Sequence, residues 1–114
     1  HGVDPALVKA VAWQESGWRQ GARSSVGAIG IMQVMPTTAD YVNKVLGHGR
    51  LNVRRAGHNI HLGVAYLRHM LRIMGSTPKA LAAYYSGPGN VKGKLNSGQR
   101  AYVRSVLALR ERFR

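Results

Sequence analysis

The sequence predicts a mainly α-helical domain, and three observations lead to this prediction. Apolar residues recur three or four positions apart through most of the chain, which is the spacing of one face of a helix. Proline and glycine stand at the borders of these segments, where helices begin and end. No segment alternates apolar and polar residues over the length of a strand. We expect residues 1–114 to form a single domain with one hydrophobic core, either a mature product or a domain cut from a longer protein.

The first two predicted helices have clear start signals. Asp4 and Pro5 begin the first, with the aspartate as its N-cap and the proline at its first helical position. One face of this helix is formed by residues three or four positions apart: Leu7, Val11, Glu15 and Trp18. Gly17 then loosens the helix. Pro36 opens the second helix, and Gly47 stops it. Its apolar side chains are Tyr41, Val42, Val45 and Leu46.

Three further helices are predicted in the second half of the chain. The third extends over about residues 54–74 and is ended by Gly75. Its apolar stripe has regular helical spacing: Ile60, Val64, Leu67, Leu71 and Met74. A fourth helix begins at Thr77 and Pro78 and continues to about residue 85. The last spans about residues 98–112, with an inner side of Tyr102, Val103, Val106, Leu109 and Phe113.

The charge of the chain is strongly unbalanced. Lys and Arg number 17 and Asp and Glu number 4, which gives a net charge of +13. Such a surface attracts polyanions, and both nucleic acid and the bacterial cell wall are polyanionic. The cations are scattered, with only Arg54 and Arg55 adjacent, which disfavours nucleic acid as the partner. No stretch approaches the ~18 apolar residues of a membrane span. There is no cysteine for a disulfide or a thiolate metal site.

Glu15 is a candidate for acid catalysis, because the chain has only four carboxylates in all. It shares the apolar face of its helix with Val11, one turn earlier. A carboxyl group in apolar surroundings resists ionisation, so its pKa rises and it can donate a proton near neutral pH. Glutamates also form structural ion pairs and caps, and for an isolated glutamate that interpretation is the stronger one.

Four short motifs follow one another along the chain: Glu15-Ser16, Gly30-Ile31-Met32-Gln33, Asn59-Ile60-His61-Leu62-Gly63 and Ala83-Tyr84-Tyr85. In this order and spacing they closely resemble the catalytic domain of the soluble lytic transglycosylases (SLT), which are relatives of goose-type lysozyme. The resemblance covers about residues 4–102. It implies a lysozyme-like fold of about five helices around a substrate cleft, and it makes catalysis the favoured role for Glu15.

The resemblance assigns a role to each matching position in the first half of the chain. Glu15 matches the family's sole acid/base, and Ser16 matches a serine that helps to position the substrate. Gly30, Met32 and Gln33 belong to a motif that lines the sugar cleft, where the methionine lies against a sugar face and the glutamine hydrogen-bonds the glycan. Without the resemblance, the glycine indicates only a tight turn and the methionine only core packing.

Three tyrosines complete the implied site. Tyr84 matches a tyrosine near the acid, and Tyr102 matches an aromatic residue of the last helix that faces the cleft. Tyr85 departs from the family pattern, which has an asparagine at this position. The ring of Tyr85 can stack on a sugar or fill the core, and stacking is slightly favoured. On helical spacing alone, all three tyrosines are better explained as core residues.

The resemblance implies a lytic transglycosylase that acts on peptidoglycan. Glu15 protonates the oxygen between N-acetylmuramic acid and N-acetylglucosamine. It then accepts the proton of the C6 hydroxyl, which closes a 1,6-anhydro ring. Two alternatives stay open. One is a hydrolytic muramidase on the same fold, with Asp40 as the candidate for positioning water. The other is a non-catalytic basic module that binds the cell wall or nucleic acid.

The expected partners are the glycan strands of peptidoglycan and the anionic wall surface. We expect a monomer without cofactor or metal, located outside the cytoplasm (secreted, in the wall or in the periplasm) or in a phage virion. His58, His61 and His69 recur along the third helix without an accompanying carboxylate or cysteine. This pattern favours a partly exposed helix face over a metal site.

Overall fold

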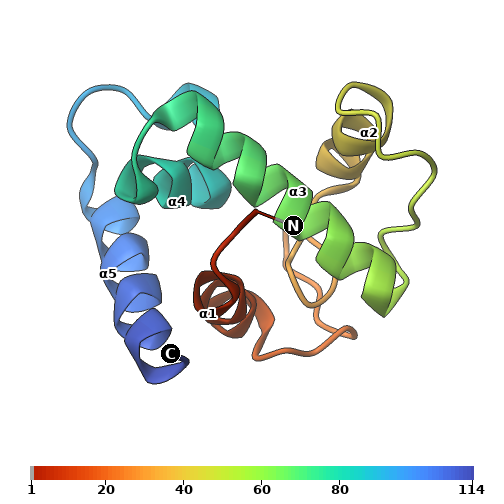
Figure 1. The fold of residues 1–114 in the computed structure, drawn as a ribbon, viewed down its shortest axis with the longest axis horizontal. Helices are drawn as coiled ribbons and strands as arrows, with labels where there is room; N and C mark the ends of the chain where they lie inside the picture. The colour runs from red at the N-terminus through yellow and green to blue at the C-terminus, as the bar shows by residue number, and fades with distance from the viewer. Residues whose placement is uncertain (1) are drawn as a thin grey trace. The chain divides into compact units, whose positions relative to one another are not determined.

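The computed structural model describes residues 2–114 and confirms the mainly α-helical class. The elements in chain order (Figure 1) are α1 (Pro5–Ser16), α2 (Pro36–Lys44), α3 (Ala56–Met74), α4 (Thr77–Ser86), the short 3₁₀ helix η1 (Pro88–Asn90) and α5 (Ser97–Arg112). Within residues 2–114 the only β structure consists of isolated bridges. The chain forms two compact units, one of residues 11–66 and one of residues 2–10 together with 67–114.

The first unit contains the end of α1, the 17–35 segment, α2 and the first half of α3. Its core is made by apolar side chains from each of these parts: Val11, Ala12, Ala28, Ile29, Met32, Val34, Ala39, Val42, Val53, Leu62 and Val64. The 17–35 segment has no helix and lies between α1 and α2 in the chain. Its backbone is therefore held by turns and by side chains of its neighbours, which the site below describes.

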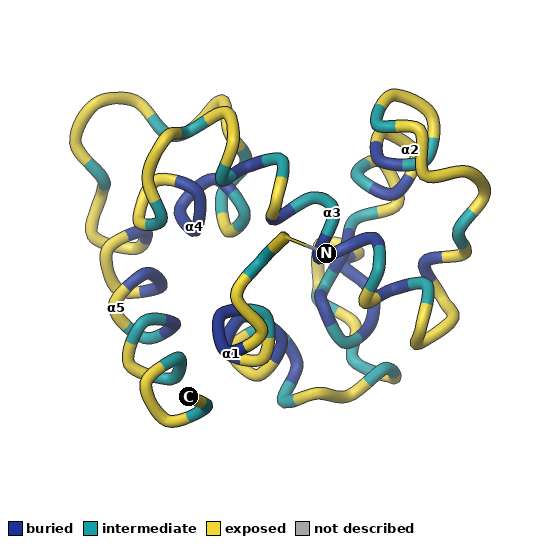
Figure 2. Tube along the Cα trace, in the orientation of Figure 1, coloured by how far each residue is buried: buried dark blue, intermediate teal, exposed yellow. Residues whose placement is uncertain are grey.

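The second unit contains the start of α1, the second half of α3, α4 and α5. The middle of α4 is buried on every side, as the dark blue stretch in Figure 2 shows. The residues of this stretch are Ala80, Leu81, Ala82 and Ala83, and the three small alanine side chains allow α5 to pack closely against the helix. The α5 side of this contact is formed by Tyr102, Val103 and Val106.

Side-chain caps fix the helix starts that the sequence predicts. The Ala6 amide donates to Asp4 Oδ1 at 3.0 Å, which confirms Asp4 as the N-cap of α1. α5 has a full capping box, in which the Gln99 amide donates to Asn96 Oδ1 and the Asn96 amide donates to Gln99 Oε1. Each such cap stabilises its helix by about 1 kcal/mol.

Two predicted helix ends are wrong by a few residues. α2 ends at Lys44 rather than at Gly47, so Val45 lies outside the helix and is exposed. Trp18 does not continue the face of α1, because the helix ends at Ser16 and Trp18 has a left-handed φ of 63°. Its ring instead packs edge-on against Trp13, with 4.9 Å between the ring centroids.

The buried face of α3 is rotated relative to the predicted stripe. Ile60 was expected in the core but is 40% exposed, whereas its neighbour Asn59 is completely buried. Apolar spacing favoured Ile60 because asparagine is rarely a core residue. The hydrogen bonds that Asn59 makes, described below, are the physical reason for the difference.

No helix among the described residues is both long and apolar enough to cross a membrane.

Candidate active site

Glu15 is the penultimate residue of α1 and is half-buried. The residue one turn earlier on the same face, Val11, is completely buried, so one side of Glu15 adjoins the core of the first unit. The other carboxylate of this unit, Asp40, is exposed on α2. Among the four acids, Glu15 is therefore the one that is half-buried, whereas Asp4, Asp40 and Glu111 are exposed.

Ser16 ends α1 and connects it to the glycine-containing loop. Its hydroxyl donates to the Ile31 carbonyl at 2.7 Å and accepts from the Arg19 amide at 3.1 Å. The side chain is only 4% exposed, and a hydroxyl has a single hydrogen to donate. The hydroxyl hydrogen of Ser16 is thus used inside the protein, and the expectation that Ser16 helps to position the substrate stays a prediction. In this structure it positions the loop next to Glu15.

The loop around Gly30 is a tight, buried turn held by two side-chain amides. Gly30 has a left-handed φ of 81°, and its amide donates to the Ala22 carbonyl at 2.9 Å. A Cβ atom at this position would lie 2.5 Å from the Asn59 side chain and 2.6 Å from that of Gln20. Glycine is needed here for the backbone conformation and for this close approach. The neighbours that require it are protein side chains.

Asn59 joins this loop to the segment that precedes α3. Its Oδ1 accepts from the Met32 amide at 2.8 Å, and its Nδ2 donates to the Ile29 and Val53 carbonyls, both at 2.8 Å. Because the residue is completely buried, these bonds satisfy backbone groups that water does not reach. No role was predicted for Asn59. Its place at the start of the Asn59–Gly63 motif was the signal that could have identified it.

Gln20 supports the same loop from the other side. Its Oε1 accepts from the Ile31 amide at 3.2 Å, and its Nε2 donates to the Arg54 carbonyl at 3.2 Å. The sequence reasoning also missed Gln20, which lies in a stretch without apolar periodicity. Together with Asn59 it fixes the backbone of the Gly30–Gln33 motif from within the first unit.

Met32 and Gln33 have different surroundings. Met32 is completely buried and packs against Gly63 of α3, so the expectation that it lies against a sugar face is not met in this structure. Gln33 is half-buried, and its Nε2 donates to the carbonyls of Ala22 and Gly30 at 3.1 and 2.9 Å. These two bonds orient the amide, which leaves its Oε1 as the atom suited to accept a hydrogen bond from a ligand.

The second unit contains the three predicted tyrosines. Tyr85 and Tyr102 stack with 4.7 Å between ring centroids and 24° between ring planes. Tyr102 is 7% exposed and Tyr85 is 51% exposed, so the buried ring supports the exposed one. Tyr84 is half-buried. The aromatic surface at the end of α4 is thus presented by Tyr85, the residue that departs from the family pattern.

A buried glutamine holds the end of α4 in place below these rings. Gln99 is 2% exposed, and its Nε2 donates to Ser86 Oγ at 3.0 Å and to the Asn90 carbonyl at 2.9 Å. A Cβ atom at the neighbouring Gly98 would lie 3.5 Å from the Tyr85 hydroxyl oxygen. The start of α5 is therefore closely fitted to the end of α4.

His58, His61 and His69 all lie on α3 and are half-buried, as expected of a partly exposed helix face, and His48 joins the first two in the first unit. His48 Nδ1 and His61 Nε2 are hydrogen-bonded at 2.9 Å, and the Asn52 amide donates to His58 Nδ1 at 2.9 Å. Among residues 2–114 no group of three or more potential ligand residues is arranged to hold a metal ion. Burial, with the nearby His48 and His58, lowers the pKa of His61 below its ordinary value of 6.5.

This pKa direction predicts a loss of stability in mild acid. A histidine whose pKa is lower in the folded state takes up its proton more readily when unfolded, so protonation favours unfolding. We expect the free energy of unfolding to fall as the pH drops from above about 6.5 through the lowered pKa of folded His61. Urea unfolding at a series of pH values measures the effect. The fall should be smaller in His61→Gln and unchanged in the control His69→Gln; an identical fall in wild type and His61→Gln would contradict it.

Residues 1–104 match the model of the transglycosylase SLT domain family. The chain is 32% identical over 128 residues to the soluble lytic murein transglycosylase of Salmonella typhimurium, an alignment that covers 93% of this chain and 20% of the relative. The chain therefore spans about a fifth of the length of this curated relative.

Two solved structures have the same fold. The 70 kDa soluble lytic transglycosylase of Escherichia coli superposes with a TM-score of 0.88 at 30% identity, over 98% of this chain and 22% of that chain. An inactive glutamate-to-glutamine variant of the lytic transglycosylase Slt of Pseudomonas aeruginosa superposes with a TM-score of 0.87 at 30% identity, with the same coverage of both chains. These likenesses confirm the predicted lysozyme-like fold.

Proposed function

Because the chain belongs to the transglycosylase SLT domain family, we propose that it is a peptidoglycan lytic transglycosylase with Glu15 as its acid and base. It cleaves the β-1,4 bond between N-acetylmuramic acid and N-acetylglucosamine and leaves a 1,6-anhydro end. Soluble lytic murein transglycosylases are among its relatives, and a glutamate-to-glutamine variant of one is inactive. As the chain spans about a fifth of such relatives, the activity of the whole protein is part of the proposal.

The observation that carries the proposal is the attachment of the acid's helix to the Gly30–Gln33 loop. The bond from the Ser16 hydroxyl to the Ile31 carbonyl fixes the last turn of α1, where Glu15 lies. Glu15 is also near the carbonyl end of the helix, which carries partial negative charge. A positioned, protonated carboxyl is what the first step of the reaction requires.

The reaction needs one carboxyl group acting twice. The Glu15 carboxyl donates its proton to the bridging oxygen while the bond from that oxygen to the anomeric carbon breaks, and the substrate's acetamido group stabilises the positive charge that develops. The Glu15 carboxylate then takes the proton of the C6 hydroxyl group on the sugar that carries this anomeric carbon. At the same time the C6 oxygen forms a bond to the anomeric carbon. Glu15 is protonated again, and no water is consumed. An intramolecular nucleophile of this kind has an effective molarity of up to ~10⁵–10⁸ M.

The surroundings of the other acids support a single-carboxyl mechanism. Most glycosidases use two carboxylates on either side of the scissile bond. Asp4 caps α1, and Glu111 lies 3.5 Å from the Arg114 guanidinium near the end of the chain. Asp40, the remaining acid, is exposed on α2. Each of the three therefore has an ordinary structural or solvent-exposed setting.

We assign the glycan contacts to the accessible members of the predicted set. Gln33 accepts a hydrogen bond from the glycan through Oε1, since its Nε2 is used by the protein. Tyr85 offers the exposed ring of the stacked pair to a sugar face, and Tyr84 contributes from the same turn of α4. Tyr102 acts by supporting Tyr85, because it is itself buried. Ser16, Gly30 and Met32 shape the loop.

The wider setting follows from the same proposal. Residues 1–114 act as one monomeric catalytic domain, outside the cytoplasm or in a virion, where peptidoglycan is accessible. The net charge of +13 holds the protein on the anionic wall. No cofactor is required, because the chemistry uses only a carboxyl group and the substrate's own hydroxyl.

The product distinguishes this function from its hydrolytic alternative. Digestion of purified peptidoglycan should release muropeptides with anhydro ends, each lighter by one water than the corresponding hydrolysed product. Mass spectrometry of the soluble products measures the difference directly. Products that all carry a reducing end would instead assign the chain to the hydrolytic muramidases.

A further inference from the structure

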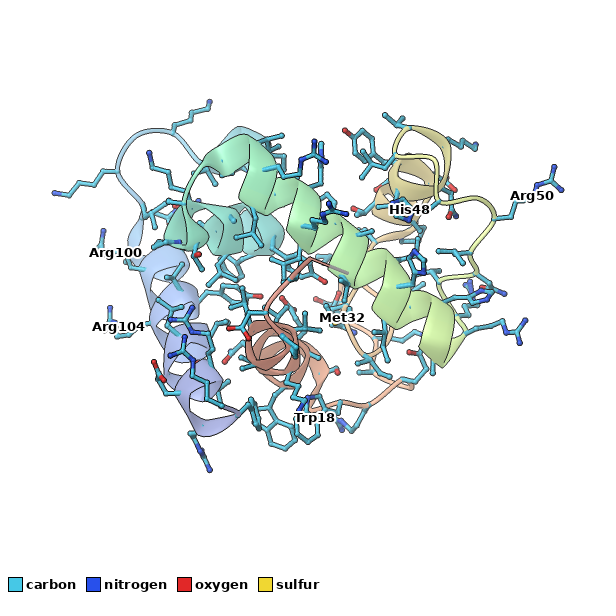
Figure 3. All side chains as sticks on the ribbon, in the orientation of Figure 1. Trp18, Met32, His48, Arg50, Arg100 and Arg104 are labelled. Carbon is cyan, nitrogen blue, oxygen red and sulfur yellow. The ribbon has the colours of Figure 1, made fainter. Side chains whose placement is uncertain are left out.

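The outer face of α5 carries cations that the fold of the second unit does not explain. Arg100 and Arg104 are one turn apart, both exposed, and project from the same side of the helix (Figure 3). The loop that leads into α5 adds two more exposed cations, Lys92 and Lys94. We call these four residues the α5 basic face.

Helix electrostatics oppose this arrangement at its first arginine. Arg100 is the fourth residue of α5, near the helix end that carries partial positive charge, and the first turn contains no acid. Like charges one turn apart, as in Arg100 and Arg104, also destabilise a helix. By contrast, Arg110 and Arg112 lie in the last turn, where cations are favourable. Arg100 and Arg104 thus lower the stability of the isolated helix α5 instead of raising it.

The second unit has few carboxylates to neutralise these cations. It contains only two, Asp4 and Glu111. Asp4 caps α1, and Glu111 is paired with Arg114 at the far end of α5. Within residues 2–114, no carboxylate forms an ion pair with the four residues of the α5 basic face. The Arg100 guanidinium does donate to the Leu95 carbonyl, which orients it without removing its charge.

The spacing of the arginines fits a linear polymer with regularly repeated negative charges. A helix rises about 1.5 Å per residue, so Arg100 and Arg104 are about 6 Å apart along the axis. Phosphates joined by a glycerol-sized linker repeat over a similar length. Guanidinium groups also bind phosphate with two parallel hydrogen bonds, which suits arginine at the centre of such a surface.

We propose that the α5 basic face docks a phosphodiester polymer attached to the cell wall. The proposal rests on the proposed function only in naming the wall as the target, since docking itself requires no turnover. It adds a second contact with the wall, separate from the glycan that is cut. The enzyme then stays at the wall surface between cleavage events and acts repeatedly on nearby strands.

The test compares two charge-matched double variants in a Glu15→Gln background, which removes turnover. Arg100→Gln with Arg104→Gln neutralises the α5 basic face. Arg50→Gln with Arg54→Gln removes the same two charges from the exposed loop between α2 and α3. Binding is measured by co-sedimentation with insoluble walls that carry poly(glycerol phosphate), and with the same walls after hydrofluoric acid has stripped that polymer. Thermal unfolding verifies that every variant is folded.

We expect the α5 variant to bind unstripped walls about threefold to tenfold more weakly, because exposed ion pairs are individually weak and are screened by water and salt. The control pair should change binding by less than about twofold. Stripping the polymer should weaken wall binding by the protein with the unaltered α5 basic face. It should also abolish the difference in binding between the two double variants. Added salt should weaken binding to unstripped walls more steeply than binding to stripped ones.

Three outcomes would overturn the proposal. Equal weakening by both double variants would mean that the whole positive surface binds diffusely. If the α5 variant also binds stripped walls more weakly than the control pair does, the α5 basic face binds the carboxylates of the peptidoglycan itself. A single-stranded nucleic acid that binds through the α5 basic face more tightly than unstripped walls do would make nucleic acid the partner. Activity is measured separately, as the release of anhydro products from stripped walls by protein in which Glu15 is intact. The proposed enzyme activity and the proposed docking can therefore fail independently of each other.

Discussion

Replacing Glu15 by glutamine is expected to abolish the release of anhydro-ended products while the fold is kept. Glutamine has nearly the same shape but can neither donate the proton to the bridging oxygen nor take it from the C6 hydroxyl. Loss of general acid–base catalysis alone lowers turnover by about 10²–10⁴-fold, and here both steps depend on the same group. The measurement is the rate of muropeptide release from purified peptidoglycan, with circular dichroism and thermal unfolding to verify the fold.

The matched control is Asp40→Asn, the same chemical change at the other carboxylate of the first unit. Asp40 is exposed on α2, so its neutralisation should leave turnover within about twofold of wild type. A large loss in Asp40→Asn would favour the hydrolytic two-carboxylate alternative. Wild-type turnover in Glu15→Gln would remove the basis of the proposed mechanism altogether.

The second large effect is expected at Gly63, where α3 meets the loop that contains Met32. A Cβ atom at this position would lie 2.4 Å from Met32 Cβ and 2.6 Å from Met32 Cγ. Both helix and loop are buried here, and the loop is further held by Asn59. Gly63→Ala should therefore lower the free energy of unfolding by about 1–3 kcal/mol or more, because a tightly packed core must shift. Denaturant unfolding at neutral pH measures this loss.

Gly57→Ala is the control for that experiment, since it makes the same substitution in the same helix. Gly57 is exposed, and a Cβ atom there would meet nothing within 4 Å. Alanine has the higher helix propensity, so this variant should be more stable than wild type by up to about 1 kcal/mol. A lower free energy of unfolding in Gly63→Ala together with a higher one in Gly57→Ala would establish that packing against Met32 causes the loss at Gly63. Equal stabilisation at both would show that the loop can move away at little cost.

Much of the fold could be predicted because helix boundaries are encoded by neighbouring residues. Pro36 and Thr77 begin helices as expected, and Gly75 follows the end of α3. These signals act through backbone groups within one turn, so they can be interpreted without knowledge of the rest of the molecule. The end of α2 was predicted less well, because the helix stops three residues before its glycine.

The roles of the loop residues could not be predicted in the same way. Ser16 and Met32 were assigned to substrate contact through the resemblance to SLT domains. The structure shows that the Ser16 hydroxyl bonds to the Ile31 carbonyl and that the Met32 side chain is completely buried against Gly63. A motif records that residues are needed together at fixed spacing. It does not distinguish those that touch the substrate from those that hold the loop.

The sequence by itself determined the helical class, because it depends on local spacing, and the resemblance of its motifs to SLT domains indicated the family and made Glu15 the candidate acid. Only the tertiary structure decided which polar residues build the site. Gln20 bonds to backbone groups 11 to 34 positions away in the chain, and Asn59 bonds to Met32 and Ile29, 27 and 30 positions away, as well as to the nearby Val53. Contacts over such separations leave no periodic pattern, since they arise only when the folded chain brings distant, otherwise unsatisfied backbone groups together.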